Sequence, residues 1–289
     1  MPPTAYHAPE TIEQAVNLLS GDASARPLAG GTDLVVQIRS GRAAPGAIVD
    51  LKRIAKLTEI RREGDGFAIG AAVPCTALKD HAALAAAWPG VVEAANLIGS
   101  VQVRNRATIA GNLCNASPAA DSVPALVAAG ATCIVVGPSG EREVPVEQIP
   151  AGPGATSLKS GEFVTEIRLP GPAKGGSDAY LRSIPRTEMD IAVVGAGASI
   201  ALDGNGTCTA ARISIGAAAP TVLLVEDAGK ALVGTKLDDA AIDKMMEAVR
   251  AACNPIDDKR GTAEYRTAMA GILAKRVVQI ACERAGGNS

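Results

Sequence analysis

Two glycine-containing segments hold the residues best suited to chemistry. The first is Ala29-Gly30-Gly31-Thr32-Asp33, between a predicted strand and a predicted helix. Glycine lets the backbone approach a phosphate closely, and the free N–H groups at the start of a helix point at an anion. Taken alone, the segment is a weak signal, because Gly-Gly after a strand is more often an ordinary turn. It indicates a phosphate site only together with a second signal.

The second segment, residues 104–121, supplies that signal. It reads RNRATIAGNLCNASPAAD and holds one glycine, several short polar residues and no aromatic side chain. Thr108, Asn112 and Ser117 can donate hydrogen bonds to phosphate or sugar oxygens, and Asp121 can accept them from sugar hydroxyls. Two such segments in one chain predict a dinucleotide site. Neither fits G-x-G-x-x-G, and G-x-x-x-x-G-K-[ST] does not occur, which disfavours a Rossmann site and a P-loop ATPase.

The apolar periodicity predicts three units that would position these segments. The first, residues 1–56, contains helices over 11–21 and 33–39 and strands over 26–29 and 47–51. The second, residues 57–170, contains a hairpin (57–62 and 67–71), helices (77–87, 90–98 and 121–129) and strands (131–136 and 162–169). A Gly/Pro-rich linker, residues 171–177, precedes the third unit, 178–289. There we expect strands over 178–184, 190–202 and 208–217 and helices over 225–233, 238–252 and 262–284.

Composition excludes several classes of function. The 28 basic and 30 acidic residues among 289 give a net charge of −2, which offers no electrostatic reason to expect nucleic acid as a partner. The longest apolar stretch, residues 193–202, is too short for a transmembrane segment, and the N-terminus lacks a secretory signal pattern. Six cysteines form no C-x-x-C, so we expect buried reduced thiols, no metal site and a cytoplasmic location.

Around these segments the sequence resembles a known family. It is similar to the FAD-binding medium subunits of molybdenum hydroxylases, typified by aerobic carbon monoxide dehydrogenase and the flavin domain of xanthine dehydrogenase. The resemblance is carried by AGGTDL and IGSVQVRNRATIAGNLCNASPAADSVPAL, then by FVTEIRLP and AYLRSIPRTEMDIAVVGAGASI in the same order. It implies an α+β, vanillyl-alcohol-oxidase-type (PCMH-type) fold. Two α+β subdomains would hold FAD between them, followed by a C-terminal domain with a three-stranded antiparallel sheet and a helical bundle.

The resemblance also implies which residues bind FAD. The first segment would wrap the pyrophosphate, residues 108–112 would form a second phosphate clamp, and Ser117 and Asp121 would bind pyrophosphate or ribityl hydroxyls. Leu34, Gly99 and Ser100 would lie near the flavin, and Val164 would cover its edge. The implied set is Ala29, Gly30, Gly31, Thr32, Asp33, Leu34, Gly99, Ser100, Thr108, Ile109, Ala110, Gly111, Asn112, Ser117, Asp121, Val164 and Arg182.

Two positions depart from the family pattern. Arg182 stands where some relatives carry a lysine near the isoalloxazine, and it keeps the positive charge that favours a reduced flavin. A surface arginine paired with Glu188 or Asp190 is the competing interpretation. Ala110 replaces a common glycine, and its methyl group is tolerated only where the backbone dihedrals suit alanine.

The resemblance implies a division of labour between subunits. Molybdopterin and iron–sulfur clusters would lie on a large and a small partner, in a dimer of heterotrimers, and electrons would pass through non-covalent FAD on this chain. The chain itself would need no catalytic acid or base, so we assign no catalytic residue, and His7 and His81 are expected at the surface or in helix caps. Two alternatives stay open: a stand-alone flavin oxidoreductase, and a structural subunit that has lost its flavin.

Overall fold

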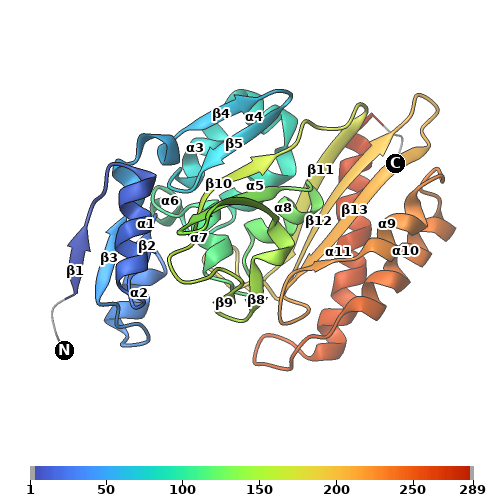
Figure 1. Ribbon diagram of the computed structural model, residues 1–289. Coiled ribbons are helices and arrows are strands. Elements are labelled where there is room, and N and C mark those ends of the chain that lie inside the picture. Colours follow the sequence, from blue (N-terminus) through green and yellow to red (C-terminus); the bar gives the residue numbers. More distant parts are fainter. Residues whose placement is uncertain (1–3, 287–289) are drawn as a thin grey trace.

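The N-terminal unit is a small parallel sheet flanked by two helices. A computed structural model describes residues 4–286. The elements of this unit are β1 (Ala5–His7), α1 (Ile12–Gly21), β2 (Arg26–Leu28), α2 (Leu34–Arg39), β3 (Ala47–Asp50) and the 3-10 turns Leu51–Arg53 and Ala55–Thr58. The strand order is β1-β3-β2, all parallel, at one end of the molecule (Figure 1). This confirms the predicted strand–helix–strand unit and adds β1, too short to leave a periodic pattern.

The second unit is a five-stranded antiparallel sheet covered by short helices. Its strands are β4 (Ile60–Glu63), β5 (Gly66–Gly70), β6 (Thr132–Gly137), β7 (Gly140–Pro145) and β10 (Phe163–Leu169), in the order β4-β5-β10-β6-β7. Its helices are α3 (Cys75–Asp80), α4 (Ala82–Ala87), α5 (Pro89–Asn96), α6 (Val101–Arg104), α7 (Ile109–Cys114) and α8 (Ser122–Ala128). A 3-10 turn, Val146–Gln148, leads into the small hairpin of β8 (Pro150–Gly152) and β9 (Ala155–Thr156).

One sequence prediction for this unit was wrong, and one strand was not predicted. The single helix expected over 77–87 is interrupted at His81, whose Nδ1 accepts a hydrogen bond from the Leu84 N–H at 3.1 Å and thereby starts α4. His81 is thus a helix cap, as expected. Strand β7 was not predicted, because three of its six residues are charged and three are exposed, so it lacks the apolar alternation that marks a half-buried strand.

The C-terminal domain packs helices on an antiparallel sheet. Its elements are β11 (Gly176–Ser183), β12 (Val194–Leu202), β13 (Cys208–Gly216), β14 (Leu223–Leu224), α9 (Glu226–Leu232), α10 (Asp239–Ala252) and α11 (Ala263–Arg284). The order β11-β12-β13-β14 gives four strands, so the expected three-stranded sheet is corrected. The fourth strand has two residues, too few to show alternation. Strand β11 begins before residue 178, inside the predicted linker.

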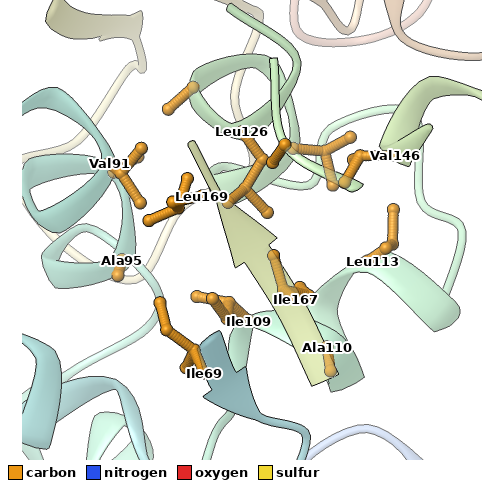
Figure 2. Close-up of a cluster of buried hydrophobic side chains, with 14 of the residues drawn as sticks. Ile69, Val91, Ala95, Ile109, Ala110, Leu113, Leu126, Val146, Ile167 and Leu169 are labelled. Carbon is orange, nitrogen blue, oxygen red and sulfur yellow. The ribbon is translucent and has the colours of Figure 1, made fainter. Parts of the chain in front are cut away.

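The core of the second unit fixes the position of α7. Ile109 and Leu113 of that helix are buried against Ile167 of β10 and Leu126 of α8 (Figure 2). Three of the six residues of α7 (Ile109, Ala110 and Leu113) are buried in this core, so the opposite side of the helix is directed elsewhere. That opposite side carries Gly111 and Asn112, which are only partly buried.

The C-terminal domain is joined to the second unit through β11. Tyr180 belongs to the hydrophobic core of the second unit, while its neighbour Ala179 belongs to the core of the C-terminal domain. The strand therefore presents one face to each core, as the period of two requires. Between residues 4 and 286 we find no helix with the length and hydrophobicity of a membrane span.

Candidate functional site

The two glycine-containing segments meet at one cavity of about 320 Å³. The N-terminal unit contributes Arg26, Pro27, Leu28, Ala29, Gly30, Gly31, Thr32, Asp33, Leu34, Gln37, Ala43 and Leu51 to its lining. The second unit contributes Ile98, Ala107, Thr108, Ala110, Gly111, Asn112, Cys114, Asn115, Gly154, Leu158, Phe163 and Val164. The cavity thus lies between two units whose lining segments are distant in sequence. Its volume is in the range typical of small-molecule sites.

Direct backbone contact joins the two segments. A Cβ placed on Gly30 would lie 2.0 Å from the carbonyl oxygen of Arg106 and 2.9 Å from the Cα of Ala107. Only glycine permits this approach, because a side chain would push the segments apart. Gly31 follows with a φ of +77°, a conformation that also favours glycine. The pair of glycines therefore serves both the turn and the close approach.

The first segment presents unused backbone donors to the cavity. Among the described residues, no protein acceptor is found for the backbone N–H groups of residues 30–34. The first intrahelical bond of α2 runs from the Val35 N–H to the Gly31 carbonyl, which leaves the preceding amides free. Asp33 is exposed and the other four residues are half-buried, so this row of amides is accessible to a ligand that accepts hydrogen bonds.

Helix α7 and its N-cap form the second segment at the cavity. Thr108 is its N-cap, and its Oγ1 accepts a hydrogen bond from the Gly111 N–H at 2.9 Å. Ala110 lies within this helix, where the backbone suits alanine, so the departure from the family's glycine costs nothing in conformation. Asn112 uses its Oδ1 to accept from Ser122, which leaves its amide NH₂ as the donor on the cavity side.

Most of the predicted site residues line the cavity. They are Ala29, Gly30, Gly31, Thr32, Asp33, Leu34, Thr108, Ala110, Gly111, Asn112 and Val164. The side chain of Ile109 lies in the hydrophobic core (Figure 2), so only its backbone is available to a ligand. Gly99 and Ser100 stand next to the lining residue Ile98, and Gly99 has a φ of +54°.

Ser117, Asp121 and Arg182 are also absent from the lining, and two of these three form a buried ion pair. Arg182 Nη1 donates to Asp121 Oδ2 at 2.6 Å, and the Tyr180 hydroxyl donates to Asp121 Oδ1 at 3.0 Å. Burial raises the pKa of Asp121 to about 6, even though Arg182 and Tyr180 act in the opposite direction. Ser117, the third, accepts from the Ala119 N–H at 3.3 Å.

Arg182 is not the surface residue of the competing interpretation. Its side chain is 4% exposed, and its contact with Asp190 is a 3.5 Å hydrogen bond to the backbone carbonyl rather than an ion pair with the carboxylate. Its Nε is buried without a hydrogen-bond partner among the described residues. The competing interpretation is therefore wrong.

Several lining residues were not foreseen. Gln37 Nε2 donates to Asn115 Oδ1 at 2.9 Å, which ties α2 to the end of α7 beside the cavity. Helical spacing could have indicated Gln37. It follows Leu34 by three positions and Asp33 by four, so all three residues lie on one face at the start of α2. Phe163, Leu158 and Gly154 have no such signal, since the fold alone brings them to the cavity.

Cys114 also lines the cavity. Burial raises the pKa of its thiol to about 12. Nucleophilic attack requires the thiolate, and a raised pKa disfavours the thiolate near neutral pH. His7 and His81 are not part of the lining. This favours non-covalent binding of whatever occupies the cavity.

Comparison with known proteins identifies the family. Residues 2–172 match the FAD binding domain in molybdopterin dehydrogenase, and residues 179–281 match the CO dehydrogenase flavoprotein C-terminal domain. This chain belongs to that family. It is a FAD-binding medium subunit of the molybdenum hydroxylase type, with the fold expected for such subunits, and its cofactor is FAD.

Relatives of this flavoprotein subunit span nearly its whole length. The carbon monoxide dehydrogenase medium chain of Afipia carboxidovorans is 39% identical over 282 residues, which covers 97% of each chain. A putative xanthine dehydrogenase FAD-binding subunit of Escherichia coli is 31% identical and covers 98% of this chain and 97% of its own.

Solved structures agree with the sequence comparisons. A Cu,Mo-CO dehydrogenase in its cyanide-inactivated form superimposes with a TM-score of 0.93 at 39% identity, covering 97% of this chain and 98% of the other. Quinoline 2-oxidoreductase from Pseudomonas putida 86 gives a TM-score of 0.90 at 27% identity, with 98% of both chains covered.

The cavity suits the diphosphate of FAD. Its glycine contact allows the backbone of two segments to come within reach of one anion, and the free amides of residues 30–34 supply neutral donors for it. Arg26 is the one basic residue of the lining within residues 4–286, and its Nη1 donates to the carbonyls of Ala23 and Ala25. The phosphate charge would be met by oriented peptide dipoles together with this guanidinium.

Proposed function

We propose that this subunit holds FAD in the cavity between its first two units and relays electrons from iron–sulfur clusters of a small partner to an external acceptor. Residues 29–33 and 108–112 would hold the diphosphate, and Leu34 and Val164 would contact the flavin ring. Gly99, Ser100, Ser117, Asp121 and Arg182 complete the proposed set. When bound, FAD supplies a ring system that accepts and releases electrons.

One observation carries this proposal: free backbone amides and a glycine-only contact converge on the same cavity. The chain's own role is then to bind, orient and shield the cofactor. Thr108 stabilises the start of α7, Gln37 and Asn115 close one side, and Phe163 and Leu158 exclude water. None of these groups has to transfer a proton to an organic substrate.

We further propose the assembly, the location and the domain limits. The subunit would join a large molybdopterin subunit and a small iron–sulfur subunit in a dimer of heterotrimers. A cytoplasmic location is supported by six cysteines that are all free thiols. Residues 1–56, 57–170 and 178–289 would act as two FAD-binding subdomains and a C-terminal domain.

The test uses the purified subunit and its complex. The subunit should be yellow, with about one FAD released on denaturation. Mixing it with a small iron–sulfur subunit reduced beforehand by dithionite and freed of excess reagent should bleach the flavin. A colourless chain that takes up no FAD would instead support a structural subunit. Turnover of the isolated chain with a small donor such as NADH would support a stand-alone oxidoreductase.

A further inference from the structure

A lysine outside the cavity contacts the first glycine segment. Lys52 Nζ donates to the carbonyl oxygen of Ala29 at 3.0 Å and forms an ion pair with Asp50 Oδ1 at 2.6 Å. The parallel pairing of β2 and β3 sets Leu28 opposite Asp50, so Ala29 leaves the sheet beside the end of β3. The register of the sheet therefore brings Lys52 to the first residue of the segment.

The ammonium group of Lys52 is held by a nearly buried carboxylate. Asp50 is 7% exposed, and its Oδ1 also accepts from the Lys52 N–H at 3.0 Å. The Tyr6 hydroxyl of β1 donates to Oδ2 at 2.6 Å, so the carboxylate links β1 to β3. Burial alone would raise the pKa of Asp50, but these hydrogen bonds outweigh burial and lower it. The carboxylate is charged, and it fixes the lysine head group.

The contact at Ala29 determines where the next amide points. A trans peptide is planar, with its C=O and N–H directed to opposite sides. The described chain contains no cis peptide bond, so holding the Ala29 carbonyl on Lys52 directs the Gly30 N–H away from the ammonium. That N–H has no acceptor among residues 4–286, and Gly30 lines the cavity while Lys52 does not.

We propose that Lys52 is a positioning residue that orients the Ala29–Gly30 peptide for FAD, with Asp50 and Tyr6 holding Lys52 in place. This inference rests on the proposed FAD site. The competing account is that Lys52 acts only as a positive charge that attracts the diphosphate. The two accounts predict opposite effects for removal of Asp50, since Asp50 restrains the lysine but also adds a nearby negative charge.

The primary test is the affinity of the full-length apoprotein for FAD, measured by flavin fluorescence. Lys52→Met should raise the Kd about tenfold, the usual size for loss of one charge-assisted hydrogen bond. Lys56→Met removes the same charge four positions later, from a half-exposed side chain that faces Glu166 at 3.7 Å, and should leave the Kd unchanged. Lys52→Arg keeps a donor for the Ala29 carbonyl and should recover most of the affinity.

Asp50→Ala decides between positioning and charge. If Lys52 must be held in place, its freed side chain regains rotamer freedom and the Kd rises about threefold or more. Tighter FAD binding in Asp50→Ala would overturn the proposal, as would a normal Kd in Lys52→Met or an Arg variant as weak as the Met variant. Thermal melting of each apoprotein checks folding. Tyr6→Phe, which deletes one hydroxyl at an exposed ring, should weaken binding slightly without unfolding the sheet.

The two levels of inference fail separately. A wild-type apoprotein that binds no FAD would refute the FAD site itself. A wild-type protein that binds FAD, together with a Lys52→Met variant that binds it equally well, would refute only the role of Lys52.

Discussion

A Cβ on Gly30 would lie 2.6 Å from the carbonyl carbon of Arg106 as well as 2.0 Å from its oxygen, and both atoms belong to backbone that cannot swing aside. Gly30→Ala should therefore separate the two segments. We expect FAD affinity to fall at least about 100-fold and stability to fall by about 1–3 kcal/mol, as for other overpacked sites. Absorbance of bound flavin after gel filtration measures the first effect and urea unfolding the second.

Gly21→Ala is the matched control for that variant. Gly21 ends α1, and nothing lies within 4 Å of a Cβ placed there. The control should bind FAD normally and be as stable as the wild type or slightly more so. Equal flavin content in the Gly30→Ala and Gly21→Ala variants would show that the contact with Arg106 is unimportant.

Asp121 is a single residue that makes the stability of the folded protein depend on pH. Its pKa is about 6 in the folded protein, against an ordinary value of 3.8, so the folded state holds the proton more tightly than the unfolded chain. The contribution of this group to stability is therefore greatest below about pH 4 and declines as the pH rises to about 6. Asp121→Asn removes this titration.

Urea unfolding of the wild-type and Asp121→Asn apoproteins at about pH 4.5 and about pH 7 measures the free energy of unfolding of each. Between these conditions the stability difference should move against the wild type by roughly 2 kcal/mol. Parallel pH curves for the two proteins would mean that Asp121 titrates alike in the folded and unfolded states.

At the scale of elements, α7 depends on its cap because it has only six residues. Thr108→Val keeps the shape of the side chain but removes the oxygen that accepts from Gly111, and Thr108 is 2% exposed. We expect a loss of about 1–2 kcal/mol in unfolding free energy and weaker FAD binding, because α7 carries the second segment. Thr108→Ser retains the hydroxyl and should stay near wild type in both measurements. A Val variant indistinguishable from the Ser variant would count against the cap.

At the scale of the whole molecule, Asp178 couples the C-terminal domain to the second unit. From β11 its carboxylate accepts hydrogen bonds from the Gly90 and Val91 N–H groups at the start of α5, at 3.0 and 2.9 Å. The group is 1% exposed, and burial raises its pKa to about 7. Arg284 of α11 donates to the carbonyl of the same residue at 2.9 Å. Helices of both parts therefore meet at one position of one strand.

Asp178→Ala should lower the free energy of unfolding by roughly 2–4 kcal/mol, because it leaves two buried N–H groups without an acceptor. It should also split the calorimetric unfolding transition into two. Asp203→Ala serves as control, because that carboxylate also accepts from two backbone amides (Asn205 and Thr207) but within an exposed turn. Equal losses in the two variants, with one sharp transition in each, would mean that Asp178 is not a link between the domains.

Local patterns in the sequence predict the chemical character of the site and most of the helices and strands. Glycine pairs, capping residues and apolar spacing act over a few residues, so they predict the AGGTD turn, the cap at Thr11 that accepts from Gln14, and the Asp203–Gly206 turn directly. They also indicated a dinucleotide, because short polar residues and glycines are needed wherever a phosphate approaches backbone.

Tertiary structure alone decided which of these groups meet. The contact of Gly30 with Arg106, the hydrogen bond of Lys52 to Ala29, and the pairing of Arg182 with Asp121 join residues 23 to 76 positions apart. Such contacts depend on sheet register and on how the units pack, and neither can be predicted from the spacing of residues along the chain. For the same reason the sequence allowed two interpretations of Arg182, a residue near the flavin or a surface residue. Its burial and its ion pair with Asp121 are visible only in the folded protein.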